Sequence, residues 1–197
     1  ELHGSGRTQT ITVEPAVAWK EVSGTLVSNA LWTTGERIRL VGSLDIVPGV
    51  ELRIEPNVVV QCLPNSEIQL GGTLIASGES SQPVIFAPRD RSQPWGGFVL
   101  RTNTAHLDLK QTILWGGGAE TNWFQLHPGS GSSHKPQRPM IYLQNGARAT
   151  LEDCALLDSQ GQATHGEASF LHGERLLVQR HVTGGQHNRG AVTMNDS

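Results

Sequence analysis

The chain has 197 residues, enough for one domain with a substantial core or for one elongated array of repeats. Its 15 basic and 18 acidic residues give a net charge of −3, which carries no electrostatic footprint for nucleic acid or anionic membranes. No apolar stretch approaches the roughly 18 residues that a membrane-spanning helix requires. Glycine occurs 23 times, and Val, Ile, Leu and Thr form brief clusters without helix-favouring runs. This composition predicts an all-β fold.

Residues 1–20 are expected to form an N-terminal lead-in or capping segment, in which residues 8–14 alternate like an edge strand. Residues 21–197 are expected to form one repeat domain. The sequence starts at Glu1 without a leader pattern, so we expect a removed signal peptide or a piece of a larger protein. Residues 191–197 resemble the start of another strand and turn, which suggests a truncated C-terminus.

One apolar frame, at positions i, i+2 and i+6, recurs along the chain. It fits Leu44/Ile46/Val50, Leu52/Ile54/Val58, Ile68/Leu70/Leu74, Leu107/Leu109/Ile113, Ala149/Leu151/Ala155 and Leu176/Val178/Val182. The first two positions indicate a short strand, and the skip of four residues fits a corner. Ile54 and Leu70 are 16 residues apart, and Leu151 and Val178 are 27 apart; both separations suit one coil of a β-solenoid with loops at its corners.

The expected corners carry turn-forming residues. Pro48 and Gly49 combine a fixed φ with a residue that readily adopts φ > 0, and Pro56 is followed by Asn57, which tolerates the left-handed region. Asn145 is followed by glycine in a further turn pair. These pairs support a coil with several flat faces.

The segment 116–138 breaks the pattern, because it is rich in Gly, Ser, Pro and His. We predict a long loop that leaves the coil, and long loops on rigid scaffolds often carry function. Trp123, Phe124 and His127 are the predicted binding residues, since exposed aromatic rings can stack on sugars. Trp95 and Trp115 are instead expected to pack in the coil or beneath the loop.

Residues 22–118 resemble secreted bacterial right-handed parallel β-helix repeat proteins. The resemblance is carried by Val-Ser-Gly-Thr-Leu at 22–26, Trp-Thr at 32–33, the run from Leu44 to Val60, Gly-Thr-Leu-Ile-Ala-Ser-Gly at 72–78, Gln-Pro-Val-Ile-Phe at 82–86 and Trp-Gly-Gly at 95–97. Asn57 stands where members usually have glycine. The resemblance implies a right-handed parallel β-helix exported to the cell envelope or outside the cell. It leaves activity open, because members include envelope-anchored modules, adhesins and parts of polysaccharide-degrading enzymes.

Catalytic candidates are few. Glycoside hydrolysis needs two carboxylates roughly 5 to 9.5 Å apart, and Asp153, Asp158 and Glu167 are the nearest candidates, with Arg180 as a partner for an acidic sugar. These four residues would need to converge on one exposed face. Neither a nucleophile elbow nor a phosphate-binding loop is present.

A metal site is the other candidate centre. Thr-His-Gly-Glu at 164–167 is echoed by Leu-His-Gly-Glu at 171–174, so His165, Glu167, His172 and Glu174 are possible zinc ligands. The HEXXH spacing is absent, and His and Glu are common on polar corners. We therefore predict no cofactor and no metal.

The two cysteines, Cys62 and Cys154, have no CxxC spacing and are predicted to be buried small hydrophobes. A disulfide between them stays open at this point.

The leading functional prediction is a non-catalytic exported module. It would be a rigid structural or adhesive element that binds polysaccharide or a protein partner at the cell surface, without nucleic acid and without a membrane-spanning segment. One alternative is a polysaccharide lyase or glycoside hydrolase with a groove along the coil. Another is a structural subunit of a larger envelope or appendage assembly, because a stack of strands leaves an edge at each end that can pair with other chains.

Overall fold

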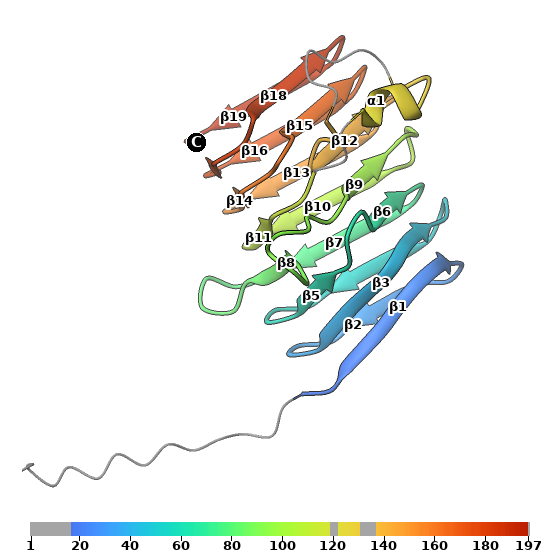
Figure 1. The fold of residues 1–197 in the computed structure, drawn as a ribbon, viewed down its shortest axis with the longest axis vertical. Helices are drawn as coiled ribbons and strands as arrows, with labels where there is room; N and C mark the ends of the chain where they lie inside the picture. Colours follow the sequence, from blue (N-terminus) through green and yellow to red (C-terminus); the bar gives the residue numbers. More distant parts are fainter. Residues whose placement is uncertain (1–16, 119–121, 131–136, 197) are drawn as a thin grey trace, which may run out of the picture.

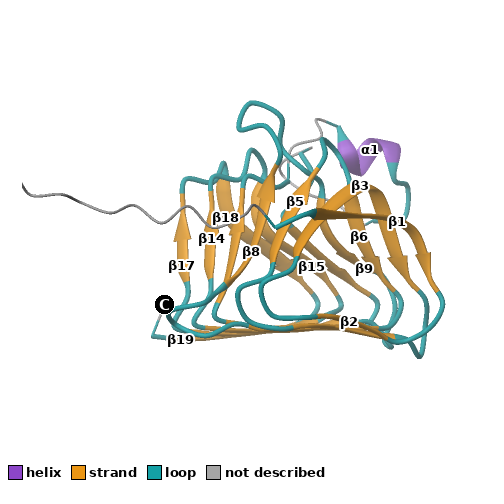
Figure 2. Cartoon of the chain, turned by 90° about the horizontal axis from the view of Figure 1, so that it is seen from below, coloured by secondary structure: helices purple, strands orange, loops and turns teal. Residues whose placement is uncertain are grey.

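The computed structural model describes residues 17–118, 122–130 and 137–196, and parallel strands dominate its regular structure (Figure 1). The strands fall into three stacks, here named A, B and C, and the chain passes from A to B to C before it enters the next coil. Figure 2 shows the strands arranged around a common interior. The stacked parallel strands form a nearly closed sheet, compatible with an all-β solenoid.

Stack B forms a sheet of its own. It contains β2 (Ala30–Trp32), β4 (Glu51–Ile54), β7 (Thr73–Ser77), β10 (His106–Lys110), β13 (Arg148–Glu152), β16 (Phe170–Glu174) and β19 (Ala191–Asn195).

Stacks A and C belong to one 12-stranded sheet, because β1 (Trp19–Leu26) and β3 (Arg37–Ile46) run through both. Stack A continues with β6 (Glu67–Leu70), β9 (Gly97–Leu100), β12 (Ile141–Gln144), β15 (Gln162–Glu167) and β18 (Thr183–Asn188). Stack C continues with β5 (Val59–Cys62), β8 (Val84–Pro88), β11 (Thr112–Trp115), β14 (Ala155–Leu157) and β17 (Leu177–Gln179).

An uninterrupted coil takes 22 residues. Leu52 lies opposite Leu74 in stack B, and Ala149 lies opposite Leu171. The predicted coil lengths of 16 and 27 residues were therefore wrong. Their residue pairs come from different stacks, because strands of neighbouring stacks share one apolar frame and cannot be told apart by spacing alone.

The interior is lined by apolar columns that cross the coils. In stack C the residues Ile38, Val60, Phe86, Leu114 and Leu156 lie in register, and each is fully buried. Burial of such a side chain contributes about 1.5–3 kcal/mol, so strands of three to five residues are stable only when neighbouring coils cover them.

Aromatic rings fill part of this interior. Trp95 is fully buried as predicted, and its ring lies 6.0 Å from that of Phe86 and 5.6 Å from that of Phe98. Its indole Nε1 donates to the backbone carbonyl of Trp115 at 2.9 Å, so the buried polar group is satisfied.

The corner between stacks B and C contains one left-handed residue in each of the later coils. Gln111, Asp153 and Arg175 have φ of 46°, 52° and 52°, and each donates its backbone N–H to a carbonyl of the following coil. One left-handed residue changes the chain direction and shifts the alternation of side chains. The i+6 frame therefore fails here, because Ile113 and Ala155 point outward from stack C.

The predicted turns have the expected backbone. Gly49 has φ of 81°, Asn57 has φ of 62°, and Asn145 and Gly146 have φ of 55° and 84°. The predicted lead-in lies mostly outside the described residues, and β1 already begins at Trp19, two residues before the expected start of the repeat domain.

Both cysteines are buried and free, as the sequence indicates. Burial raises the pKa of the Cys62 thiol, and it raises the pKa of Cys154 to about 11. Neither thiol has the thiolate character that a nucleophile or a metal ligand needs.

Candidate functional site

The catalytic candidates do not converge. Asp153 lies at the corner between stacks B and C, Asp158 at the corner between C and A, and Glu167 at the corner between A and B. These are the three different corners of one stretch of coil. Arg180 ion-pairs with Asp158 alone of the three. The geometry therefore brings no pair of these carboxylates across a common sugar bond.

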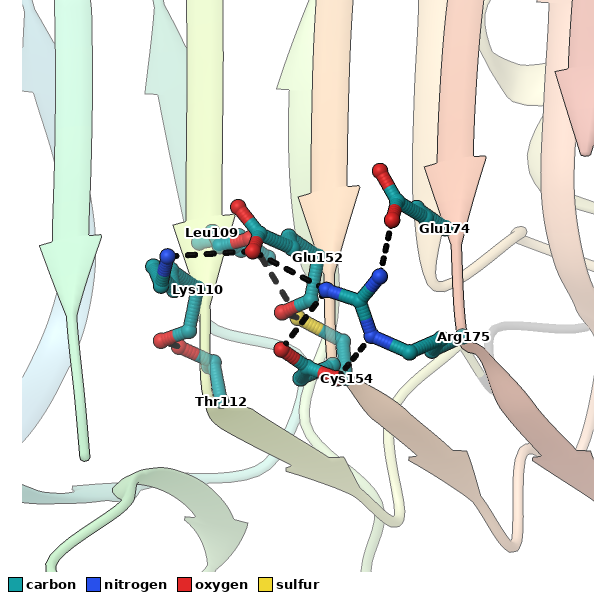
Figure 3. A network of polar contacts seen from close by, with 8 residues as sticks. Leu109, Lys110, Thr112, Glu152, Cys154, Glu174 and Arg175 are labelled. Carbon is teal, nitrogen blue, oxygen red and sulfur yellow. Dashed lines mark hydrogen bonds and ion pairs between the residues drawn. The ribbon is translucent and has the colours of Figure 1, made fainter. Parts of the chain in front are cut away.

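Asp153 ion-pairs instead with Arg175, which Figure 3 shows in a network with Glu152 and Glu174 that links successive coils. Arg175 binds Asp153 and Glu174, and its Nη2 lies 3.0 Å from Oε1 of Glu152, which also accepts from Lys110 at 3.0 Å. Hydrogen bonding from Arg175 lowers the pKa of Asp153. These groups are partly exposed, so each pair contributes little, and the network ties neighbouring corners together.

Among the metal candidates, His165 and Glu167 lie together, with His165 Nε2 3.4 Å from Glu167 Oε1, but the two histidines are separated. His165 and His172 point outward from consecutive strands, but His165 lies on stack A and His172 on stack B. Glu167 and Glu174 end the same two strands. Within the described residues, no group of three His, Cys, Asp or Glu side chains could hold a metal ion.

Residues 122–130 of the 116–138 loop lie on the outer face of stack A. Trp123, in the short helix α1 (Trp123–Leu126), is fully buried and packs with Val99 and Tyr142. Its ring centroid is 5.0 Å from that of Tyr142, and its Nε1 donates to Oε1 of Glu67 at 3.3 Å. Trp123 thus fastens the loop to the sheet and offers no free ring face for a sugar.

Phe124 and His127 belong to the same cluster. The Phe124 ring lies 4.7 Å from that of His165, and the His127 ring stacks on Trp123 at 4.7 Å. His127 Nδ1 also lies 2.9 Å from the backbone carbonyl oxygen of Trp123. The structure brings the three predicted binding residues together, and their contacts are with the protein itself.

A buried ion pair anchors the end of this loop. Arg138 Nε lies 3.2 Å from Oε1 of Glu67, and the two side chains are only 4% and 8% exposed. Gln69 donates to the second carboxylate oxygen of Glu67 at 2.8 Å. Sequence reasoning missed this pair, because a lone glutamate in a strand has the pattern of a surface residue and its partner is 71 positions away.

A surface hollow of about 360 Å³ lies at the corner between stacks C and A, and we name it the Trp115 hollow. It is lined by Pro88, Arg91, Pro94, Trp115, Gly116, Asp158 and Gln160. Trp115 ends β11 with its side chain half-buried. Its Nε1 donates to Oδ2 of Asp158 at 2.7 Å, and the Arg91 guanidinium lies 4.8 Å from its ring centroid.

The carboxylate in the Trp115 hollow is held ionised. Hydrogen bonds from Arg180 are the largest cause, and the Trp115 indole adds to them; together they lower the pKa of Asp158 to about 2. A carboxylate already committed to two donors orients the indole ring and does not supply a proton.

The Trp115 hollow differs in chemistry from a hollow on the outer face of stack B and from another at the corner between stacks A and B. Those hollows, of about 160 and 520 Å³, have no Trp, Tyr or Phe in their lining. The Trp115 hollow combines an aromatic ring, a guanidinium and hydrogen-bonding groups in a volume typical of small-ligand sites. The sequence prediction that Trp115 packs in the coil is only half right, since its ring also borders this surface hollow.

No protein-family model, curated protein or solved structure matches the chain. No helix in the described ranges combines the length and apolar character needed to cross a membrane.

Proposed function

We propose that the chain is a non-catalytic, exported binding module whose rigid coil presents the Trp115 hollow to a polysaccharide. The single observation that carries the proposal is this hollow, in which an indole, a guanidinium and an ionised carboxylate border one site. A sugar ring has apolar C–H faces and hydroxyl edges, and these groups are complementary to both.

Right-handed winding is part of the proposal. It is supported by the strong preference of parallel-strand crossovers for the right-handed sense, which arises from the twist of L-amino-acid strands. The resemblance of residues 22–118 to exported right-handed β-helices also supports the right-handed winding, and it supports the proposed export of the chain.

A binding role is favoured over catalysis because Asp153, Asp158 and Glu167 occupy different corners. A binding role also fits the rigid scaffold, since Trp115 belongs to a strand that is paired on both sides. The ring is therefore pre-positioned, and little ordering entropy is lost when a ligand binds.

Access to the ring requires a small movement of Arg91. Arg91 is exposed, and its contact with Trp115 is a cation–π interaction at the surface, which contributes about 0.5–1 kcal/mol. A sugar that stacks on the indole can displace the guanidinium at this modest cost and then accept hydrogen bonds from it.

The test is a glycan array followed by calorimetry with the best glycan. Trp115→Ala is expected to weaken binding by at least about tenfold, because it removes the aromatic centre of the site. Trp19→Ala is the matched control, since Trp19 is also half-buried on stack C and lies 5.0 Å from an arginine, Arg39.

Circular dichroism shows whether both variants keep the strand signal. If Trp115→Ala binds as tightly as the parent protein, the Trp115 hollow is not the site. If the parent protein binds no glycan on the array, the polysaccharide function is wrong.

A further inference from the structure

A second hollow adjoins the Trp115 hollow. It measures about 600 Å³ and is lined by Leu63, Pro64, Arg89, Asp90, Arg91 and Gln93. Arg91 borders both hollows, so the two share one guanidinium.

The two hollows follow the long axis of the coil. Their lining comes from one corner, between stacks C and A, in successive coils: Pro64 follows β5, Arg91 follows β8, Gly116 follows β11 and Gln160 follows β14. Neighbouring coils lie about 4.8 Å apart, as paired strands do, so these four corners span about 14 Å. A groove of this length accommodates several linked sugar units.

The charges along this corner favour an anion. Arg89 and Arg91 are exposed, and among the described residues no carboxylate lies within ion-pairing distance of either. Asp90 is the nearest acidic residue in sequence, and its Oδ1 accepts from the backbone N–H and the hydroxyl of Ser92 at 2.9 and 2.8 Å. Asp158 is neutralised by Arg180. With Asp158 neutralised by Arg180, Arg89 and Arg91 outnumber Asp90, the one remaining carboxylate of the two linings, so the corner carries a net positive charge on a chain whose net charge is −3.

Resting on the proposed function, we infer that the ligand is an anionic polysaccharide, bearing carboxylate or sulfate groups, that lies along this corner parallel to the coil axis. One sugar ring stacks on Trp115, and an acidic group of the chain binds Arg91 between the two hollows. A guanidinium binds carboxylate or sulfate through two parallel hydrogen bonds, which fixes both position and direction. Arg89 extends the positive track into the second hollow.

The probes are polygalacturonate, alginate and chondroitin sulfate, with fully methyl-esterified polygalacturonate as an uncharged chain of the same backbone. We expect calorimetric binding to at least one acidic polymer, a loss of at least about tenfold in Arg91→Gln, and weakening as salt rises from about 50 to about 500 mM. Oligomers that span both hollows are expected to bind more tightly than the corresponding disaccharide.

Arg148→Gln is the matched control. Arg148 also stacks on an aromatic ring, with its guanidinium 4.3 Å from the Phe170 centroid, but it lies on stack B. The Arg148→Gln substitution removes the same charge from the protein as Arg91→Gln does, and it is expected to leave polysaccharide binding unchanged. If Arg148→Gln weakens binding as much as Arg91→Gln does, only the net charge of the protein matters and the inference is overturned.

The remaining outcomes separate this inference from the proposed function. Binding of a neutral polysaccharide that Trp115→Ala abolishes and Arg91→Gln preserves would overturn the anionic ligand and leave the proposed function standing. Equal affinities for the disaccharide and the longer oligomers would overturn the inference that one polysaccharide chain occupies both hollows. If the protein binds no polysaccharide, both the anionic ligand and the proposed function are wrong.

Discussion

Arg180 lies directly over Asp158 in the next coil, 22 residues later, and both residues have φ of 57°. The backbone follows the same path at both positions, and the N–H of Asp158 donates to the carbonyl of Gln179 at 3.1 Å. A guanidinium therefore stacks on a carboxylate at equivalent corners, and the pair helps to hold the ring of Trp115 in its hollow.

This pair predicts an acid-dependent loss of stability. The pKa of Asp158 is about 2 in the folded protein, below the value of about 3.9 for an unfolded chain. A lowered carboxyl pKa stabilises the fold above about pH 4, and this contribution is lost as the pH falls through 2. Asp158→Asn is expected to reduce the free energy of unfolding at pH 7 by about 1 kcal/mol, since solvent screens this exposed pair.

Urea unfolding of the parent protein and Asp158→Asn at pH 7, 4 and 2 measures the effect, and the difference should shrink toward pH 2. Asp108→Asn is the control, because Asp108 lies on the outer face of stack B. A difference between parent and Asp158→Asn that stays constant over this pH range would show that the charge of Asp158 is not responsible.

A second prediction concerns the fastening of the loop. Trp123→Ala removes a fully buried ring and its hydrogen bond to Glu67, so the free energy of unfolding should fall by about 3 kcal/mol. Leu126→Ala, in the same helix but 63% exposed, should change it by less than about 0.5 kcal/mol. Denaturant titration followed by circular dichroism compares the two. Equal stability of both variants would mean that Trp123 does not anchor the segment.

A third prediction concerns the close approach of two strands. Gly97 has φ of 137°, and a Cβ there would lie 2.3 Å from the carbonyl oxygen of Met140. Gly97→Ala is therefore expected to destabilise the fold by about 3 kcal/mol or more. Gly184→Ala is the control, because no atom lies within 4 Å of its added methyl group. Thermal unfolding should show a much lower melting temperature for Gly97→Ala alone, and comparable melting temperatures would contradict the contact.

The strands and several corners could be predicted from the sequence. Pro48 and Asn57 mark turns because their side chains restrict or tolerate particular φ values, and this property is local. The length of a coil could not be predicted in this way. At positions such as Gln111 and Arg175 the left-handed backbone falls on a residue whose side chain carries no turn signal, and its backbone N–H donates to a carbonyl of the next coil.

The roles of the tryptophans required the tertiary structure. Trp123 sits in a polar stretch of sequence, but Val99 and Tyr142 come from other coils and bury it. Trp115 ends an apolar strand, but its side chain points outward from stack C. Local polarity describes the neighbours in sequence, whereas exposure depends on the neighbours in the stack, so Trp123 is buried and Trp115 borders the surface.

Gln111 is the one residue between β10 and β11, so the connection between these strands has no spare length. Because side chains alternate along a strand, one inserted residue at this point would reverse the facing of the side chains of β11, turning Leu114 toward water and Ile113 toward the core. Tolerance to insertions should therefore differ sharply among the corners, and the edge that carries the segment 116–138 is the natural place to graft new loops onto this scaffold.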